Sequence, residues 1–145
     1  MDASLGYAGC AACLGLAAIG SSIGCYVAGA ASHGAMAKVD EGHGKFIGMS
    51  AAPSSQPIYG IVLMFVLIGK VNAGAGLGLL AIGVFCGLAM MTSAILQGRV
   101  AGTGIQASTK KPEIFGKCFA AVGIVESFAL FAMVGGLIIT GGIGA

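Results

Sequence analysis

Four long apolar runs constrain this chain more than any other feature of its sequence. They extend over residues 5–31, 47–68, 77–105 and 118–143, and each exceeds the roughly 20 residues that a helix needs to cross a bilayer. Only 8% of the residues are charged, whereas a soluble domain has about 25%, so lipid must be the main solvent. The runs do not alternate as barrel strands do. We therefore predict an all-α membrane protein with four transmembrane helices.

The charged residues predict an orientation and exclude one class of partner. The net charge is +2, and no basic patch is interleaved with aromatic residues, so we expect no nucleic-acid partner. Six of the seven Lys and Arg residues fall at the first and third connections, and only Lys70 falls at the second. The positive-inside rule then places the first and third connections in the cytoplasm. Both termini are expected on the opposite side of the membrane.

The sequence contains an internal repeat of about 72 residues. Residues 27–30 read VAGA and residues 100–103 read VAGT, an offset of 73, while residues 59–62 align with residues 131–134 at an offset of 72. A fixed period of this kind indicates a duplicated structural unit. We predict two tandem helical hairpins, residues 1–72 and residues 73–145.

The first helix of each predicted hairpin is rich in glycine. The four-residue spacing that lets helix backbones touch occurs at Gly20/Gly24, Gly83/Gly87 and Gly98/Gly102. Glycine faces on one helix and bulky residues on the other suit a ring of copies with the glycines inside. Ordinary packing within one monomer would produce the same spacing, so the pattern leaves both arrangements open.

Glu126 is the only acidic residue inside a predicted span. It lies nine residues beyond Lys117, about 13 Å along a helix, where an ionised carboxylate costs at least roughly 2.5–3.5 kcal/mol. We count no basic residue at matching depth. Glu126 must therefore be protonated, bind a cation, or pair with a cation from another subunit. An ion carrier alternates between those states, although a neutral acid that only supports packing is the structural alternative.

Oxygen-bearing side chains are predicted at the depth of Glu126. Gln97 and Gln56 lie at similar distances from the cytoplasmic connections, and Ala52, Ser55, Gln56 and Tyr59 share one helical stripe. The 72-residue offset places Ser54 opposite Glu126, so the first hairpin has no second carboxylate and the chain builds one site from four helices.

Two prolines should add backbone oxygens to this layer. Pro53 and Pro57 cannot donate backbone hydrogen bonds, which leaves the carbonyls of Met49 and Pro53 without their usual helical partners. Hard cations prefer several oxygen ligands, whereas a proton needs only the carboxyl group. The layer favours Na⁺, and H⁺ stays open because amides also bond a protonated acid.

Several motifs resemble those of a known family. They are PSSQ (residues 53–56) with YG (59–60), QGRVA (97–101) followed by GIQ (104–106), KPE (111–113) and VE (125–126). With them, nearly the whole chain resembles the proteolipid subunit (c or K) of V-type rotary ATPases, in its bacterial four-helix form. The resemblance implies a homo-oligomeric rotor ring in the bacterial inner membrane, with the ion on Glu126 and no other cofactor.

The same resemblance implies partners for the ring. A stator subunit would supply an arginine to the empty site, and a central stalk would dock on the cytoplasmic connections. ATP hydrolysis or synthesis would occur in a separate soluble head, so the chain alone is not an enzyme. One carboxylate per four helices favours pumping, and ATP synthesis stays open.

The resemblance also implies a ligand set. Sodium-pumping members hold the ion with positions that match Glu126, Gln97, Gln56, Ser55 and the backbone carbonyl of Ala52, supported by a hydrogen bond from the position that matches Tyr59. Three residues depart from the family pattern, namely Ser55 for threonine, Ala52 for leucine and Pro57 for glycine. The first keeps the hydroxyl, the second keeps the carbonyl, and the third could shift the second helix.

A different transport class also fits a lone intramembrane carboxylate. A small self-contained exporter would use Glu126 beside an aromatic substrate pocket, yet Phe128 and Phe131 are the only aromatic candidates in the fourth span and the chain has no tryptophan. A ring of many copies would distinguish the rotor protein from this exporter.

Overall fold

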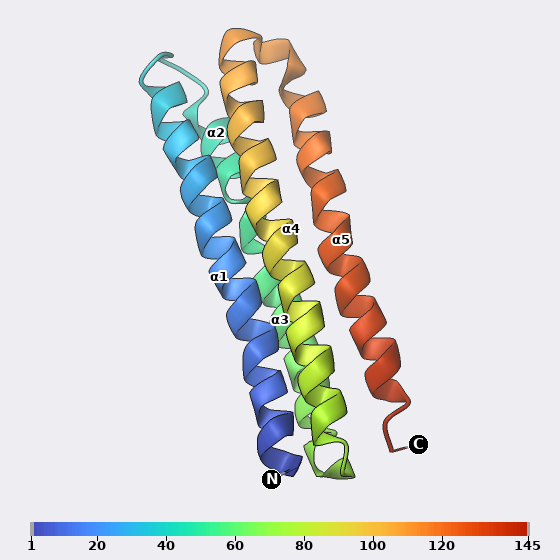
Figure 1. Cartoon of the computed structure of the whole chain (residues 1–145). Coiled ribbons are helices and arrows are strands. Elements are labelled where there is room, and N and C mark those ends of the chain that lie inside the picture. The colour runs from blue at the N-terminus through green and yellow to red at the C-terminus, as the bar shows by residue number, and fades with distance from the viewer. Residues whose placement is uncertain (1, 145) are drawn as a thin grey trace.

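The computed structural model describes residues 2–144, and every element in this range is helical (Figure 1). The first, third and fourth spans are α1 (Asp2–Met36), α4 (Gly76–Lys110) and α5 (Phe115–Gly141). The second span consists of α2 (His43–Ser50), the short 3₁₀ helix η1 (Ala52–Ser54) and α3 (Gln56–Ile68). Two further 3₁₀ turns, η2 (Val71–Ala73) and η3 (Pro112–Ile114), lie in the connections. Four helical segments are long and apolar enough to cross a membrane, which confirms the predicted fold class.

The helices extend beyond most of the predicted spans. The apolar run 5–31 becomes a helix that continues to Met36, and the run 77–105 continues to Lys110, whereas α5 ends at Gly141, two residues before the predicted end. Hydropathy marks only the part of a helix that lies in hydrocarbon. The polar residues that follow continue the helix, so the connections are shorter than predicted.

The second span is not one continuous helix. The α-helical pattern stops at Ser50 and resumes at Gln56, with η1 between them. Pro53 and Pro57 each occupy the first turn of a new helical segment, where the missing N–H of proline costs no helical hydrogen bond. The expected disturbance by the two prolines is therefore a break that exposes backbone carbonyls beside Gln56.

The two glycine-rich helices, α1 and α4, form the most extensive helix–helix contact in the chain. A Cβ atom at Gly20 would lie 2.5 Å from the Met91 Cα atom, and one at Gly98 would lie 2.6 Å from the Gly24 carbonyl carbon. Side chains other than hydrogen cannot fit at these crossings. Part of the glycine pattern thus serves packing within one chain, while Gly15 and Gly29 face open space.

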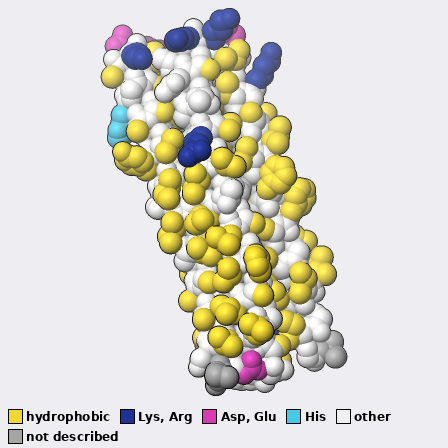
Figure 2. Space-filling model, in the orientation of Figure 1, with side chains coloured by type: hydrophobic (Ala, Val, Ile, Leu, Met, Phe, Trp, Pro, Cys, Tyr) yellow, Lys and Arg dark blue, Asp and Glu magenta, His cyan; other side chains and the backbone are white. Residues whose placement is uncertain are grey.

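The two ends of the bundle differ in charge. The connections 37–42 and 111–114 lie at one end, which we call the connection end, while the termini and η2 lie at the other, the terminal end (Figure 1). Lys and Arg side chains gather at the connection end (Figure 2). At the terminal end the Lys70 ammonium donates to the Ile143 carbonyl at 2.7 Å, and the Gly76 N–H donates to the Asp2 carboxylate at 2.8 Å. The predicted hairpin boundary at 72/73 falls within η2 and stays a prediction.

Candidate ion-binding site

The Glu126 carboxylate lies in the middle of α5 and accepts two hydrogen bonds from other helices. The Tyr59 hydroxyl of α3 donates to its Oε1 at 2.5 Å, and the Gln97 amide of α4 donates to its Oε2 at 3.3 Å. Glu126 itself is half-buried. The carboxylate therefore has two neutral donors and still reaches the surface of the bundle.

Two buried glutamines continue this hydrogen-bonded cluster toward the break in the second span. The Gln56 amide donates to the Gln97 side-chain oxygen at 2.7 Å, and both side chains are completely buried. Gln97 also donates to the Val122 carbonyl of α5 at 3.3 Å. The layer counted from the sequence is thus one connected set of groups from α3, α4 and α5.

Ser55 and Ala52 complete the set at the helix break. The Ser55 hydroxyl lies 3.4 Å from the Gln56 side-chain oxygen and 3.3 Å from the Ala52 carbonyl oxygen. The Ser55 N–H reaches the same carbonyl only at 3.5 Å. Because these contacts are long for hydrogen bonds, the Ala52 carbonyl keeps lone-pair capacity for another partner.

Two serines support the site, and the sequence analysis did not identify them. The Ser21 hydroxyl of α1 donates to the Pro53 carbonyl, and the Ser93 hydroxyl of α4 donates to the Val125 carbonyl at 2.8 Å. The Pro53 carbonyl is one of the two that the prolines were predicted to release. It is therefore occupied by Ser21 and is not a candidate ligand. A search for hydroxyl residues on the neighbouring helix would have found this partner.

Arg99 corrects one premise of the sequence analysis. It lies inside α4, two residues beyond Gln97, so the two residues differ in depth by only about 3 Å. A basic residue does exist near the depth of Glu126. Two helical residues correspond to a rotation of about 200°, and accordingly Arg99 is exposed while Gln97 is buried. Arg99 thus faces away from the site.

The cluster can offer several oxygen atoms to a cation. They come from the Glu126 carboxylate, the amides of Gln56 and Gln97, the Ser55 hydroxyl and the Ala52 carbonyl. Within residues 2–144 no three His, Cys, Asp or Glu side chains come together, so a transition-metal site of nitrogen and sulfur ligands is not present there. The donors are of the hard oxygen type that alkali and alkaline-earth cations prefer.

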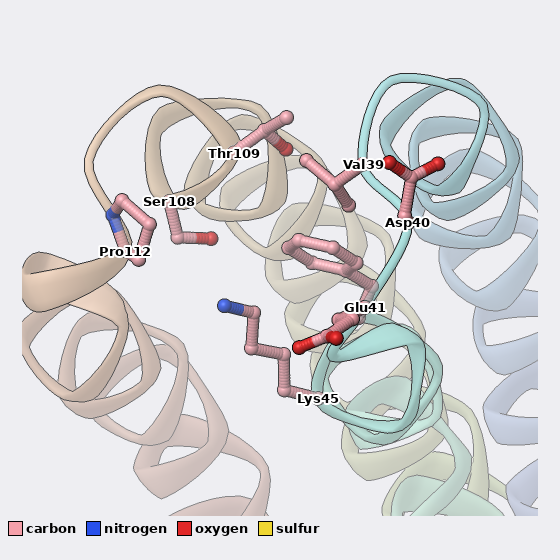
Figure 3. A pocket seen from close by; sticks show the side chains of 8 residues that line it. Val39, Asp40, Glu41, Lys45, Ser108, Thr109 and Pro112 are labelled. Carbon is pink, nitrogen blue, oxygen red and sulfur yellow. The ribbon is translucent and has the colours of Figure 1, made fainter.

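Two surface cavities flank α4 at different depths. One of about 510 Å³ lies between α4 and α5 beside the site and is lined mainly by apolar residues, among them Leu88, Leu96 and Phe128. The other, of about 350 Å³, lies at the connection end, where Lys45 of α2 points toward Ser108 and Pro112, with Asp40 and Glu41 nearby (Figure 3). The Lys45 ammonium lies 5.1 Å from the centre of the Phe46 ring. Neither cavity contains Glu126.

Comparisons with known proteins agree with the duplicated fold. The family model for the C-type subunit of ATP synthase matches twice, at residues 8–67 and 80–139. The chain is 30% identical over 129 residues to the K-type subunit of the A-type ATP synthase of Methanocaldococcus jannaschii, covering 89% of this chain and 58% of that protein. It is also 30% identical over 122 residues to the K-type subunit of the V-type sodium ATPase of Enterococcus hirae, covering 80% of this chain and 77% of that protein.

The two family matches are separated by 72 residues and each includes both helices of one hairpin, so the four spans are two tandem copies of one unit. The chain spans under two thirds of the length of the Methanocaldococcus relative. Two matches that together cover most of the chain, four membrane-spanning helices and a carboxylate in the fourth lead to one conclusion. The chain is a multi-pass membrane protein that belongs to the family of C-type subunits of ATP synthase.

Proposed function

We propose that this chain is the rotor-ring subunit of a V-type rotary ATPase or ATP synthase and that it carries Na⁺ on Glu126. The observation that carries the proposal is a half-buried carboxylate within a membrane span whose partners, Tyr59 and Gln97, are neutral donors. An ionised carboxylate in this position is costly without a cation. A transported ion supplies that charge, and its release restores the demand for one.

The ligand set supports Na⁺ as the ion. The carboxylate, the two amides, the Ser55 hydroxyl and the Ala52 carbonyl form one continuous cluster, and a proton would need none of the last four groups. The Enterococcus relative belongs to a sodium ATPase by name. In the ion-bound state we propose that the amide oxygens of Gln56 and Gln97 turn toward Na⁺, while Tyr59 keeps its bond to Glu126.

The position of Glu126 at the bundle surface supports an exchange step. Its neighbours on α5, Ile124 and Phe128, are 66% and 62% exposed, which suits a lipid-facing surface. In the proposed cycle a stator subunit presents an arginine to this surface, pairs with the empty carboxylate and displaces the ion. The completely buried glutamines stay in place, so the site is ready for the next ion.

The repeat supports assembly into a ring. Helix α3 packs against α1 of its own hairpin and also contacts α4 and α5 of the next one. Helix α5 holds the corresponding place in the second hairpin, yet no third hairpin packs on it within the described residues. The apolar groove between α4 and α5 lies on this unpartnered side. A second copy that supplies its first hairpin there would continue the pattern and close a ring.

The charge distribution supports the proposed orientation in a bacterial inner membrane. Basic residues gather at the connection end (Figure 2), so this end is assigned to the cytoplasm and both termini to the other side. The central stalk of the complex would then dock on the connections. Pumping and ATP synthesis use the same site and differ only in the direction of rotation, since the ATP chemistry occurs in a separate head.

The test replaces one atom of the site. Glu126→Gln keeps the size of the side chain and removes the charge, so the ring should assemble as before, while ATP-driven ²²Na⁺ uptake by proteoliposomes of the whole complex should fall to the level without ATP. Ser127→Gln, on the exposed side of α5, is the control and should keep most of the uptake. Full uptake in the Glu126→Gln complex, or a chain that is monomeric in mild detergent, would refute the proposal.

A further inference from the structure

We infer that α1 and α4 form a binding site for the phosphate headgroup of an anionic phospholipid at the connection end. The site is a cavity of about 660 Å³ between the two helices. Helix α1 and the residues that follow it contribute a small-residue wall and Lys38, and α4 contributes Thr103, Gln106 and Lys110. The volume lies within the range of typical small-ligand pockets.

The chemistry of the lining suits a phosphate diester. Lys38 and Lys110 supply two ammonium groups from different segments of the chain, and Gln106 supplies an exposed amide. No acidic residue lines the cavity. The nearby acids, Asp40 and Glu41, line the separate cavity of Figure 3. Positive and negative charges of the first connection are thus separated into two different cavities.

The wall of the cavity leaves room for a headgroup between the helices. It is built from Ala30, Ala31, Gly34 and Ala35, and a Cβ atom at Gly34 would contact nothing within 4 Å. Larger side chains here would occupy the space that now remains open. The small residues at this level therefore do not bring α1 and α4 together as Gly20, Gly24 and Gly98 do lower in the bundle.

Helix α4 extends the cationic character below the cavity. Arg99, Thr103, Gln106 and Lys110 recur at spacings of four, three and four residues and are all exposed, so they form one stripe along the helix. Lower on the same stripe the exposed residues include Leu96 and Phe85. A lipid lying along this stripe would place its phosphate among the cations and its acyl chains on the apolar part.

The position of the cavity favours a lipid over a free anion. Its walls belong to two membrane-spanning helices, and it occupies the last two turns before the helices leave the bilayer. Basic pockets between transmembrane helices on the cytoplasmic side bind anionic headgroups, and each basic residue near the surface strengthens such binding about fivefold. The site lies away from Glu126, so it is independent of the ion-carrying function.

Native mass spectrometry of the purified assembled protein tests the inference with three probes: phosphatidylglycerol, phosphatidylcholine and inorganic phosphate. Phosphatidylglycerol should bind, phosphatidylcholine should not, and millimolar inorganic phosphate should fail to displace the lipid. The double variant Lys38→Gln/Lys110→Gln should bind phosphatidylglycerol about 30-fold more weakly. The charge-retaining variant Lys38→Arg/Lys110→Arg should bind it as the unmodified protein does.

The matched control is Lys45→Gln/Lys117→Gln, which removes the same charge from the same end but outside this cavity and should leave lipid binding unchanged. Equal binding of the two lipids, or equal loss in the two double variants, would overturn the inference. Displacement by inorganic phosphate would also overturn it, because the site would then take a free anion. Glu126→Gln should bind the lipid normally, so failure here is distinguishable from failure of the proposed ion transport.

Discussion

At the scale of single residues, depth in the membrane was the most informative quantity that the sequence contained. Counting from the charged connections placed Gln56, Gln97 and Glu126 in one layer, and the structure joins them by hydrogen bonds. The count failed for Arg99, because distance along a helix contains no information about the side from which a residue projects. The rotation of α4 about its axis had to be added before Arg99 could be separated from Gln97.

Hydrogen-bond direction within the layer could not be predicted from the sequence. An amide can turn either its oxygen or its nitrogen to a neighbour, and the choice depends on the partner. Here Gln97 donates to Glu126 and accepts from Gln56, so each group in the row satisfies the next. The sequence supplied the members of the layer, while only the structure supplied their order.

Replacing Tyr59 by Phe should weaken ion retention. Tyr59 donates to the Glu126 carboxylate at 2.5 Å, and a hydrogen bond to a charged group contributes about 1.5–3 kcal/mol. The Na⁺ concentration that half-protects Glu126 from a carbodiimide should therefore rise at least about tenfold. Tyr26→Phe removes a hydroxyl that is 76% exposed on α1 and should leave the midpoint unchanged. Equal midpoints in both variants would show that Tyr59 does not support the ion.

At the scale of elements, hydropathy predicted which segments cross the membrane and proline predicted where one of them is disturbed. The form of the disturbance was not predictable. Proline rules state that carbonyls lose partners, but whether a 3₁₀ turn, a kink or a neighbouring hydroxyl satisfies them depends on the helix that packs alongside. In this chain the neighbour is α1, and Ser21 is the residue that reaches the Pro53 carbonyl.

Replacing Ser21 by Ala should destabilise the break in the second span. The Pro53 carbonyl would lose its donor in a buried position, which costs about 1–3 kcal/mol. We expect a lower thermal midpoint of the purified protein by near-ultraviolet circular dichroism. Ser22→Ala is the adjacent control, because that hydroxyl only donates to the Ile19 carbonyl of its own helix. A Ser21→Ala protein as stable as the control would contradict the assigned role.

Glycine spacing likewise predicted close helix contact but not its partner. The structure shows that Gly98 of α4 crosses Gly24 of α1, so two glycines separated by half of the chain share one crossing. Spacing alone could not distinguish this contact from one between copies. The open faces at Gly15 and Gly29 are the part of the pattern that packing within one chain does not use.

Replacing Gly98 by Ala should separate α1 from α4 at that crossing. The added Cβ atom would meet the backbone of Gly24, and overpacking of this kind costs about 1–3 kcal/mol or more. The chain should unfold at a lower concentration of denaturing detergent. Gly78→Ala on the same helix is the control, since a Cβ there meets nothing within 4 Å, and alanine should slightly stabilise the helix. Equal effects at the two positions would refute the crossing.

At the scale of the whole molecule, duplication explains why one chain has four spans and one intramembrane carboxylate. The two family matches are 72 residues apart, and the position that this offset assigns to a second carboxylate is occupied by Ser54, which is exposed. A ring of given circumference would then carry half as many ions per turn as one built from two-helix subunits. Fewer ions per ATP allow each to move against a steeper gradient, about 2.3 kcal/mol per charge per 100 mV.

The repeat was visible in the sequence, but its structural consequence was not. An offset states that two segments are alike, and it does not state that α3 is enclosed by both hairpins while α5 is left with one open side. That asymmetry places the ion site where the second hairpin meets the first. It also leaves the α4–α5 groove as the surface for the next copy.

The most direct test of the central claim, that Glu126 binds Na⁺, is carbodiimide labelling of the assembled protein in membranes with and without Na⁺. We predict that one residue, Glu126, is modified, that Na⁺ slows the reaction in proportion to its occupancy, and that the same concentration of K⁺ does not. Protection should weaken as the pH is lowered, because protons compete for the same carboxylate. Labelling of Glu126 that millimolar Na⁺ leaves unchanged at every pH would contradict the claim.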